Sequence, residues 1–109
     1  GMNAAIIIIQ ILFFITEKDY DLAGNRIEAS RKYRYRHLND EETKRSHIFF
    51  KMLNKVLLGE FKRSSVQKKA AELLKKLQSL PLEIASQEVE VEIIPYEKLW
   101  FLILERLEN

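Results

Sequence analysis

The sequence predicts an all-α fold of about five helices, stacked as antiparallel hairpins in a helical-repeat-like arrangement or a bundle. Two features of its composition support this prediction. Of the 109 residues, 47% are hydrophobic, enough for one helical domain over residues 1–109 and too many for a disordered chain. The chain has only three Gly and two Pro, whereas a small β-sandwich needs many of both in its tight turns. In addition, apolar residues recur every three or four positions through most of the sequence, which is typical of amphipathic helices.

The first element is an apolar run, Ala4–Ile15, in which Gln10 is the one polar residue. Its four consecutive isoleucines also suit a buried strand, so the pattern leaves helix and strand open. We favour a helix because the segments that follow are helical. The run is shorter than the roughly 18 apolar residues of a membrane-spanning helix, and the charged residues after it do not resemble a signal-peptide cleavage site. We therefore expect a buried element and no membrane segment.

The second predicted helix covers about residues 19–38. Asp19 or Asp21 can cap its first turn, because a carboxylate there accepts hydrogen bonds from free backbone N–H groups. Its inward face consists of residues three and four positions apart, namely Tyr20, Ala23, Ile27 and Ser30. This face is shorter and more polar than those of the later helices.

The third predicted helix, about residues 40–60, has the clearest apolar stripe. The stripe consists of Phe49, Met52, Leu53, Val56 and Leu57. Asn39 and Glu42 have the spacing of a capping box at its start. Gly59 is expected to adopt the left-handed conformation that commonly ends a helix.

The fourth predicted helix covers about residues 65–80. Ser64 and Gln67 have capping-box spacing at its start, and Pro81 ends it because proline has no backbone N–H. Its apolar residues alternate at spacings of four and three: Val66, Ala70, Leu73, Leu77 and Leu80. Short connections between these helices predict antiparallel hairpins.

After Pro81 the periodicity changes. Glutamate and apolar residues alternate strictly from Glu88 to Ile93, which predicts one short extended segment near residues 88–94. Pro95 suits the first turn of a final helix. The apolar face of that helix contains Leu99, Trp100, Ile103 and Leu107, and we expect Trp100 to be mostly buried.

Positive charge is concentrated in the first part of the chain. Residues 1–76 carry a net charge of +7 and residues 77–109 carry −5. The densest basic stretch, residues 31–37, interleaves arginines with tyrosines, an arrangement that can bind phosphates and stack on bases. On a helix these residues surround the axis, so we favour an ion-paired, solvated surface. In the alternative, nucleic acid is bound by Arg31, Lys32, Arg34 and Arg36.

The sequence predicts neither an enzyme nor a metal or cofactor site. It has no cysteine, which excludes thiolate chemistry and is compatible with the cytoplasm. His37 and His47 are ten residues apart and lack the spacing of a helical metal pair. Ser46 and His47 are adjacent, so on a helix they do not face each other as a nucleophile and its base would. Glu88, Glu90 and Glu92 are best read as a solvated acidic face.

Three segments, Arg31–Leu38, Lys44–Leu53 and Glu92–Trp100, resemble the C-terminal portions of bacterial proteins built from tetratricopeptide-like helical repeats. The resemblance covers about a third of the chain and implies stacked helical hairpins with a protein-binding role. The chain has no 34-residue self-similarity, so what the resemblance implies is an irregular terminal unit, the C-terminal part of a larger helical-repeat protein. Gly1 before Met2 has the form of a scar left by tag removal.

These observations predict a non-catalytic, cytoplasmic protein–protein interaction module. The alternative is a nucleic-acid-binding regulatory protein that uses residues 31–37. The run Ala4–Ile15 is apolar on every side, and a helix at the edge of a small domain buries only part of its circumference. We therefore predict a homodimer whose contacts include Ile8 or Phe13, because large exposed apolar patches usually mark interfaces.

Overall fold

The computed structural model describes residues 4–37, 44–81 and 94–109. Within these ranges the chain is all-α, as predicted, and forms five helices: α1 (Ala4–Thr16), α2 (Tyr20–His37), α3 (Lys44–Leu58), α4 (Arg63–Ser79) and α5 (Tyr96–Arg106). The first apolar run, for which the sequence left helix and strand as alternatives, is a helix. The predicted extended segment near 88–94, apart from Ile94, and the Asn39–Glu42 capping box lie outside the described residues.

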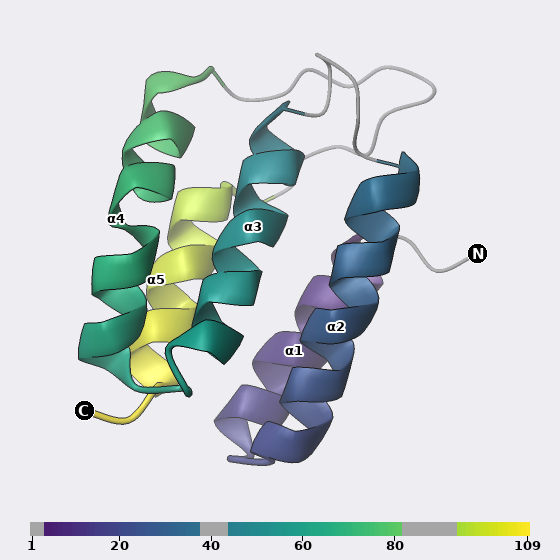
Figure 1. Ribbon diagram of the computed structural model, residues 1–109, viewed down its shortest axis with the longest axis vertical. Helices are drawn as coiled ribbons and strands as arrows, with labels where there is room; N and C mark the ends of the chain where they lie inside the picture. The colour runs from purple at the N-terminus through teal and green to yellow at the C-terminus, as the bar shows by residue number, and fades with distance from the viewer. Residues whose placement is uncertain (1–3, 38–43, 82–93) are drawn as a thin grey trace.

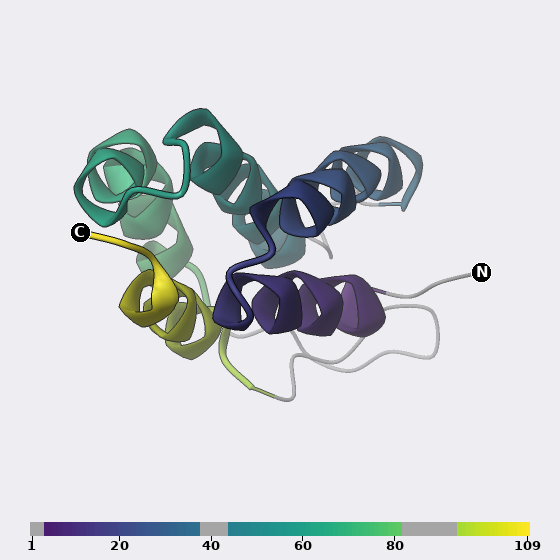
Figure 2. The same ribbon diagram turned by 90° about the horizontal axis from the view of Figure 1, so that it is seen from below.

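The five helices form two layers. Figures 1 and 2 show α2, α3 and α4 side by side in one layer, with α1 and α5 in the other. Each helix runs antiparallel to the next one in the sequence, so that α1 and α2, and likewise α3 and α4, form hairpins. The shortest dimension of the molecule is 21 Å, which accommodates two layers of helices of about 10 Å each. Among the described residues, no helix is long and apolar enough to cross a membrane.

The predicted apolar stripes form the core between the layers. Buried residues of the stripes are Ala23, Ile27 and Ser30 on α2; Phe49, Met52, Leu53 and Val56 on α3; Val66, Ala70 and Leu77 on α4; and Trp100 and Ile103 on α5. Trp100, with 1% of its surface exposed, is buried as predicted. The periodicity therefore identified the inward face of each of these helices.

Asp19 caps α2, which is one of the two capping residues predicted. The backbone N–H of Leu22 donates a hydrogen bond to its Oδ1 at 3.2 Å, the usual bond of an N-cap side chain. Immediately before it, Lys18 has a φ of 59° and closes the end of α1, with the N–H of Asp19 bonded to the carbonyl of Phe14 at 2.9 Å. The three-residue connection thereby ends one helix and starts the next.

The prediction that Gly59 adopts a left-handed conformation is wrong. Gly59 has no positive φ, and the left-handed residues are instead Glu60 (φ 55°) and Phe61 (φ 59°). The N–H of Phe61 donates to the carbonyl of Val56 at 3.1 Å, so the helix-ending motif lies one residue later than expected. Glycine is required here for space: a Cβ on Gly59 would lie 2.6 Å from Cγ2 of Val66 on α4.

Gly59→Ala is therefore expected to destabilise the protein by about 1–3 kcal/mol, because the stiff Val66 side chain must move to admit the added methyl group. Gly24→Ala is the matched control. Its Cβ would meet Cδ1 of Leu57 at 3.4 Å, an ordinary contact, and alanine in a helix interior is favoured over glycine by about 0.5–1 kcal/mol. Chemical denaturation of both variants tests the contrast. Equal effects on the free energy of unfolding would contradict it.

The capping box predicted for Ser64 and Gln67 is also wrong. Helix α4 begins at Arg63, its N-cap is Lys62, and no side chain makes a capping hydrogen bond there. The N–H of Arg63 instead donates to the carbonyl of Glu108 at 2.6 Å, within a parallel bridge between Lys62 and Glu108. The residues after α5 thus cap α4 through a contact that local sequence does not encode.

Candidate functional site

Among the described residues, the outward side of α1 exposes three large hydrophobic side chains on one helix. Ile9 is 65% exposed and Phe13 56%, and Ile6 is exposed beside them. These residues follow the helical spacing of three and four and lie opposite the buried stripe of Ala4, Ile7, Ile8, Ile11 and Ile15. We call Ile6, Ile9 and Phe13 the α1 face. No charged residue occurs between Ala4 and Thr16, so this face has no charge that would repel a second apolar surface.

Of the two residues predicted to contact a second copy, the structure leaves one available. Phe13 belongs to the α1 face, whereas Ile8 is only 5% exposed and packs in the core. The sequence did not orient this helix, because Gln10 and the terminal Thr16 are its only polar residues and do not form a polar side. Ile9, adjacent to Ile8, takes its place on the surface.

The described side chains of the basic stretch, residues 31–36, differ in their surroundings. Arg31 pairs with Glu28 on the same helix at 3.1 Å, and the ring of Tyr33 packs edge-on against Phe50, with centroids 5.6 Å apart. The guanidinium of Arg34 lies 5.0 Å from the ring centroid of Tyr35, and its Nε is buried without a hydrogen-bond partner in the described part of the chain. Lys32 and Arg36 are exposed. As expected for a helix, the stretch is distributed around the axis.

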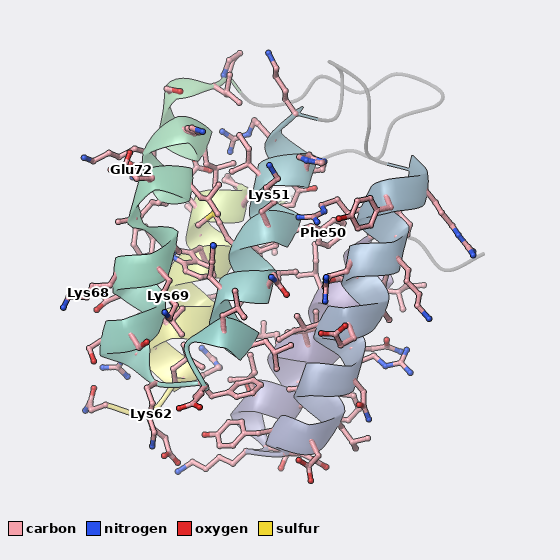
Figure 3. The ribbon with its side chains drawn as sticks, in the orientation of Figure 1. Phe50, Lys51, Lys62, Lys68, Lys69 and Glu72 are labelled. Carbon is pink, nitrogen blue, oxygen red and sulfur yellow. The ribbon has the colours of Figure 1, made fainter. Side chains whose placement is uncertain are left out.

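A surface of lysines without intervening aromatic residues lies on α3 and α4, and it was not predicted from the sequence. Three lysines of α3 share its outward side at spacings of seven and four, and two lysines of α4 lie on the side of that helix next to α3. We call these five residues the lysine face: Lys44, Lys51, Lys55, Lys69 and Lys76. Figure 3 shows Lys51 and Lys69 on the same side of the molecule, on neighbouring helices. The packing of α3 on α4 assembles this surface from residues far apart in the sequence.

Arg45 is also part of the positive charge of α3, but it is buried, with 2% of its surface exposed. Its Nη1 donates to the carbonyl oxygens of Leu77 at 2.6 Å and Leu80 at 2.9 Å, at the end of α4. Its Nη2 pairs with the carboxylate of Glu97 on α5. A cation in this position satisfies carbonyls that have no partner within the helix and is favoured by the helix dipole. Arg45 therefore ties three helices together.

Arg63 of α4 likewise satisfies backbone carbonyls, here at the end of α5. Its Nε donates to the carbonyl of Leu104 at 2.8 Å, and its Nη2 to those of Glu105 at 2.9 Å and Leu107 at 3.0 Å. Neither arginine was predicted from the sequence to have this role. A signal was present, because Arg45 stands four residues before Phe49 and Arg63 three before Val66, so each continues an apolar stripe.

Tyr20, the first residue of α2, connects the α1–α2 hairpin to Glu108 near the end of the chain. Its ring stacks on Phe61 with a centroid distance of 4.8 Å, and its hydroxyl donates to Oε1 of Glu108 at 3.3 Å. Burial, and after it the negative charge of Glu108, raises the pKa of Tyr20 above its ordinary value. The phenol therefore stays protonated and remains a hydrogen-bond donor at neutral pH.

Of the residues considered for catalysis, Ser46 lies inside the core. Ser46 is buried, and its hydroxyl lies 2.8 Å from that of Tyr96, whose ring stacks on Phe49 at a centroid distance of 4.6 Å. This polar pair links α3 to α5 inside the core. Within residues 4–37, 44–81 and 94–109, no three His, Cys, Asp or Glu side chains gather as a metal site would require. The side chain of His37 and the glutamates 88, 90 and 92 lie outside the described residues.

No known protein family matches this chain, and no curated protein or solved structure matches it either. The resemblance to tetratricopeptide-like proteins therefore stays a prediction. Two surfaces remain as candidates for function, the α1 face and the lysine face.

Proposed function

We propose that this protein is a non-catalytic protein-interaction module and that a second copy of the chain binds the α1 face. The observation that carries the proposal is the exposure of Ile9 and Phe13 on a helix without a single charge. Protein interfaces have apolar, aromatic-rich centres surrounded by polar rims. The α1 face is apolar and contains one aromatic ring, that of Phe13, and the more polar Gln10 and Thr16 lie near it on the same helix.

Charge favours the α1 face over the opposite layer as the surface of a symmetric dimer. A two-fold axis brings the same patch of both copies together. Two lysine faces brought together in this way would repel each other, whereas two α1 faces would not. The α1 face therefore suits self-association better than any positively charged surface of the molecule.

The expected dimer is weak. Six half-exposed side chains, three from each copy, gain on the order of 1 kcal/mol each when they are buried. That total only slightly exceeds the lower bound of about 4 kcal/mol for the cost of association, so flanking polar contacts must add to it. We expect a Kd of about 1 mM, for which the flanking contacts must contribute about 2 kcal/mol.

Sedimentation velocity over a concentration series from micromolar to millimolar tests the proposal. The wild-type protein should shift from monomer to dimer, and Phe13→Glu should remain monomeric at every concentration, because a carboxylate cannot be buried in an apolar contact without a large cost. Leu58→Glu is the matched control. Leu58 is 55% exposed, almost the same as Phe13, but it belongs to α3 in the other layer, so this variant should dimerise like the wild type.

A wild-type protein that stays monomeric throughout the series would refute self-association. Dissociation of the dimer by Leu58→Glu, or a normal dimer of Phe13→Glu, would place the contact elsewhere. Melting temperatures of both variants, read by circular dichroism, should stay close to that of the wild type, since both sites are on the surface.

The hairpins α1–α2 and α3–α4 also support the proposal that the chain is the terminal unit of a helical-repeat protein. In such a protein each hairpin stacks on the next one, and an unstacked terminal hairpin leaves an apolar face exposed. In that arrangement the preceding repeat would cover the α1 face in place of a second copy of the chain. The cytoplasm is the compartment that we propose, on the strength of the cysteine-free sequence.

A further inference from the structure

The lysine face has the single-sign charge of a polyanion-binding surface. Helix α3 contains no Asp or Glu, and Glu72, the one acidic residue of α4, lies 3.8 Å from the Nζ of Lys75. In the part of the chain that the structure describes, Lys51, Lys55, Lys69 and Lys76 form no ion pair. A helix surface adapted only for solubility mixes both signs, because neighbouring like charges repel. The uncompensated lysines of this face therefore require another explanation.

The arrangement of these lysines is fixed by the packing of the hairpin. The contact between Gly59 and Val66 at one end and the bond from Arg45 to Leu80 at the other hold α3 and α4 in register. This register brings Lys55 near the level of Lys69, and Lys51 near the level of Lys76. At 1.5 Å of rise per residue, charges on the same helix are about 6–10 Å apart, and helix axes in contact are separated by about 8–10 Å. The lysine ammonium groups are therefore spaced regularly along and across the two helices.

We propose that the lysine face binds the phosphate backbone of a double-stranded nucleic acid without reading its sequence. Phosphates of a duplex are spaced on the same scale as these lysines, and their neutralisation releases condensed counterions. Ammonium groups contact phosphates as point charges and do not discriminate between bases as a bidentate arginine does. The two arginines of α3 and α4, Arg45 and Arg63, are engaged with helix carbonyls.

The residues around the lysines favour a duplex over other anionic partners. Single-stranded nucleic acids are held by exposed aromatic rings, but the aromatic residues of α3, Phe49 and Phe50, are buried and α4 contains none. An acidic protein would need apolar or aromatic anchors at the centre of its contact. On these two helices the large exposed hydrophobic residue is Leu58, at the end of α3, away from the centre of the face.

Fluorescence anisotropy with a labelled random-sequence DNA duplex, measured from about 50 to 200 mM salt, tests this proposal. If each of the four unpaired lysines contacts one phosphate, the slope of log K against log salt is about −3.6. Lys51→Gln/Lys69→Gln should then weaken binding at least about tenfold at the lowest salt, and bring the slope closer to zero by nearly one unit per lysine. Affinity should not depend on the duplex sequence.

Lys32→Gln/Arg36→Gln is the matched control. It removes the same charge from exposed positions of α2 and should weaken binding by less than about threefold, through net charge alone. A larger loss in this control than in the α3–α4 variant would assign binding to the stretch 31–37 and refute the proposal. Absence of salt-dependent duplex binding would refute it too, as would binding only to vesicles of phosphatidylcholine and phosphatidylserine. Failure here leaves the dimerisation test unaffected, because the two use different surfaces.

Discussion

Replacement of Trp100 with alanine is expected to lower the free energy of unfolding by about 3–5 kcal/mol, which approaches the whole stability of a domain this small. Trp100 is the largest of the fully buried side chains, and it belongs to the hydrophobic core. Its removal leaves a cavity that the surrounding helices cannot fill without moving. Urea denaturation followed by circular dichroism measures the loss, since the variant has no tryptophan fluorescence.

Phe101→Ala provides the control on the same helix. Phe101 is 48% exposed, so its truncation should change the free energy of unfolding by less than about 1 kcal/mol. In the wild-type protein, the fluorescence of Trp100 should be blue-shifted and poorly quenched by iodide. Equal losses in the two variants, or emission typical of tryptophan in water, would contradict the burial of Trp100 in solution.

Arg45→Met is the second change expected to have a large effect, also about 3–5 kcal/mol. Methionine fills a similar volume but leaves the carboxylate of Glu97 and the carbonyls of Leu77 and Leu80 without their donor, and breaking a buried pair by removing one partner is strongly destabilising. Arg45→Lys should fall between the wild type and Arg45→Met, because one ammonium group cannot reach all three acceptors.

A double-mutant cycle with Glu97→Gln separates the ion pair from the helix cap. The double variant should lose less stability than the two single losses added together, because the carboxylate and the guanidinium act on each other. Arg31→Met is the control for an exposed pair. The Arg31–Glu28 pair is solvated, so its loss should cost at most about 0.5 kcal/mol. Additive effects of Arg45→Met and Glu97→Gln would show that the buried pair is not a coupled unit.

The number of helices and the buried faces of α2 to α5 could be predicted from the sequence because both depend on local spacing. Phe49, Met52 and Val56 fall on one side of any α-helix, whatever surrounds it. The helix ends were harder to predict. Asp19 was identified as a cap because its bond to Leu22 spans three residues, whereas the cap of α4 comes from Glu108, 45 residues from Arg63, and leaves no local pattern.

The candidate surfaces depended on the tertiary structure for the same reason. The sequence determined that Ala4–Thr16 is apolar except for Gln10 and Thr16, and two polar residues do not define a polar side that would tell which residues face outward. Packing against α2 and α5 decided that Ile8 is buried and Phe13 exposed. Similarly, the sequence determined an excess of positive charge, but helix packing determined where each charge lies. Packing places Arg45 and Arg63 against helix carbonyls and Lys51 and Lys69 on one face, because residues far apart in the sequence become neighbours only when helices pack.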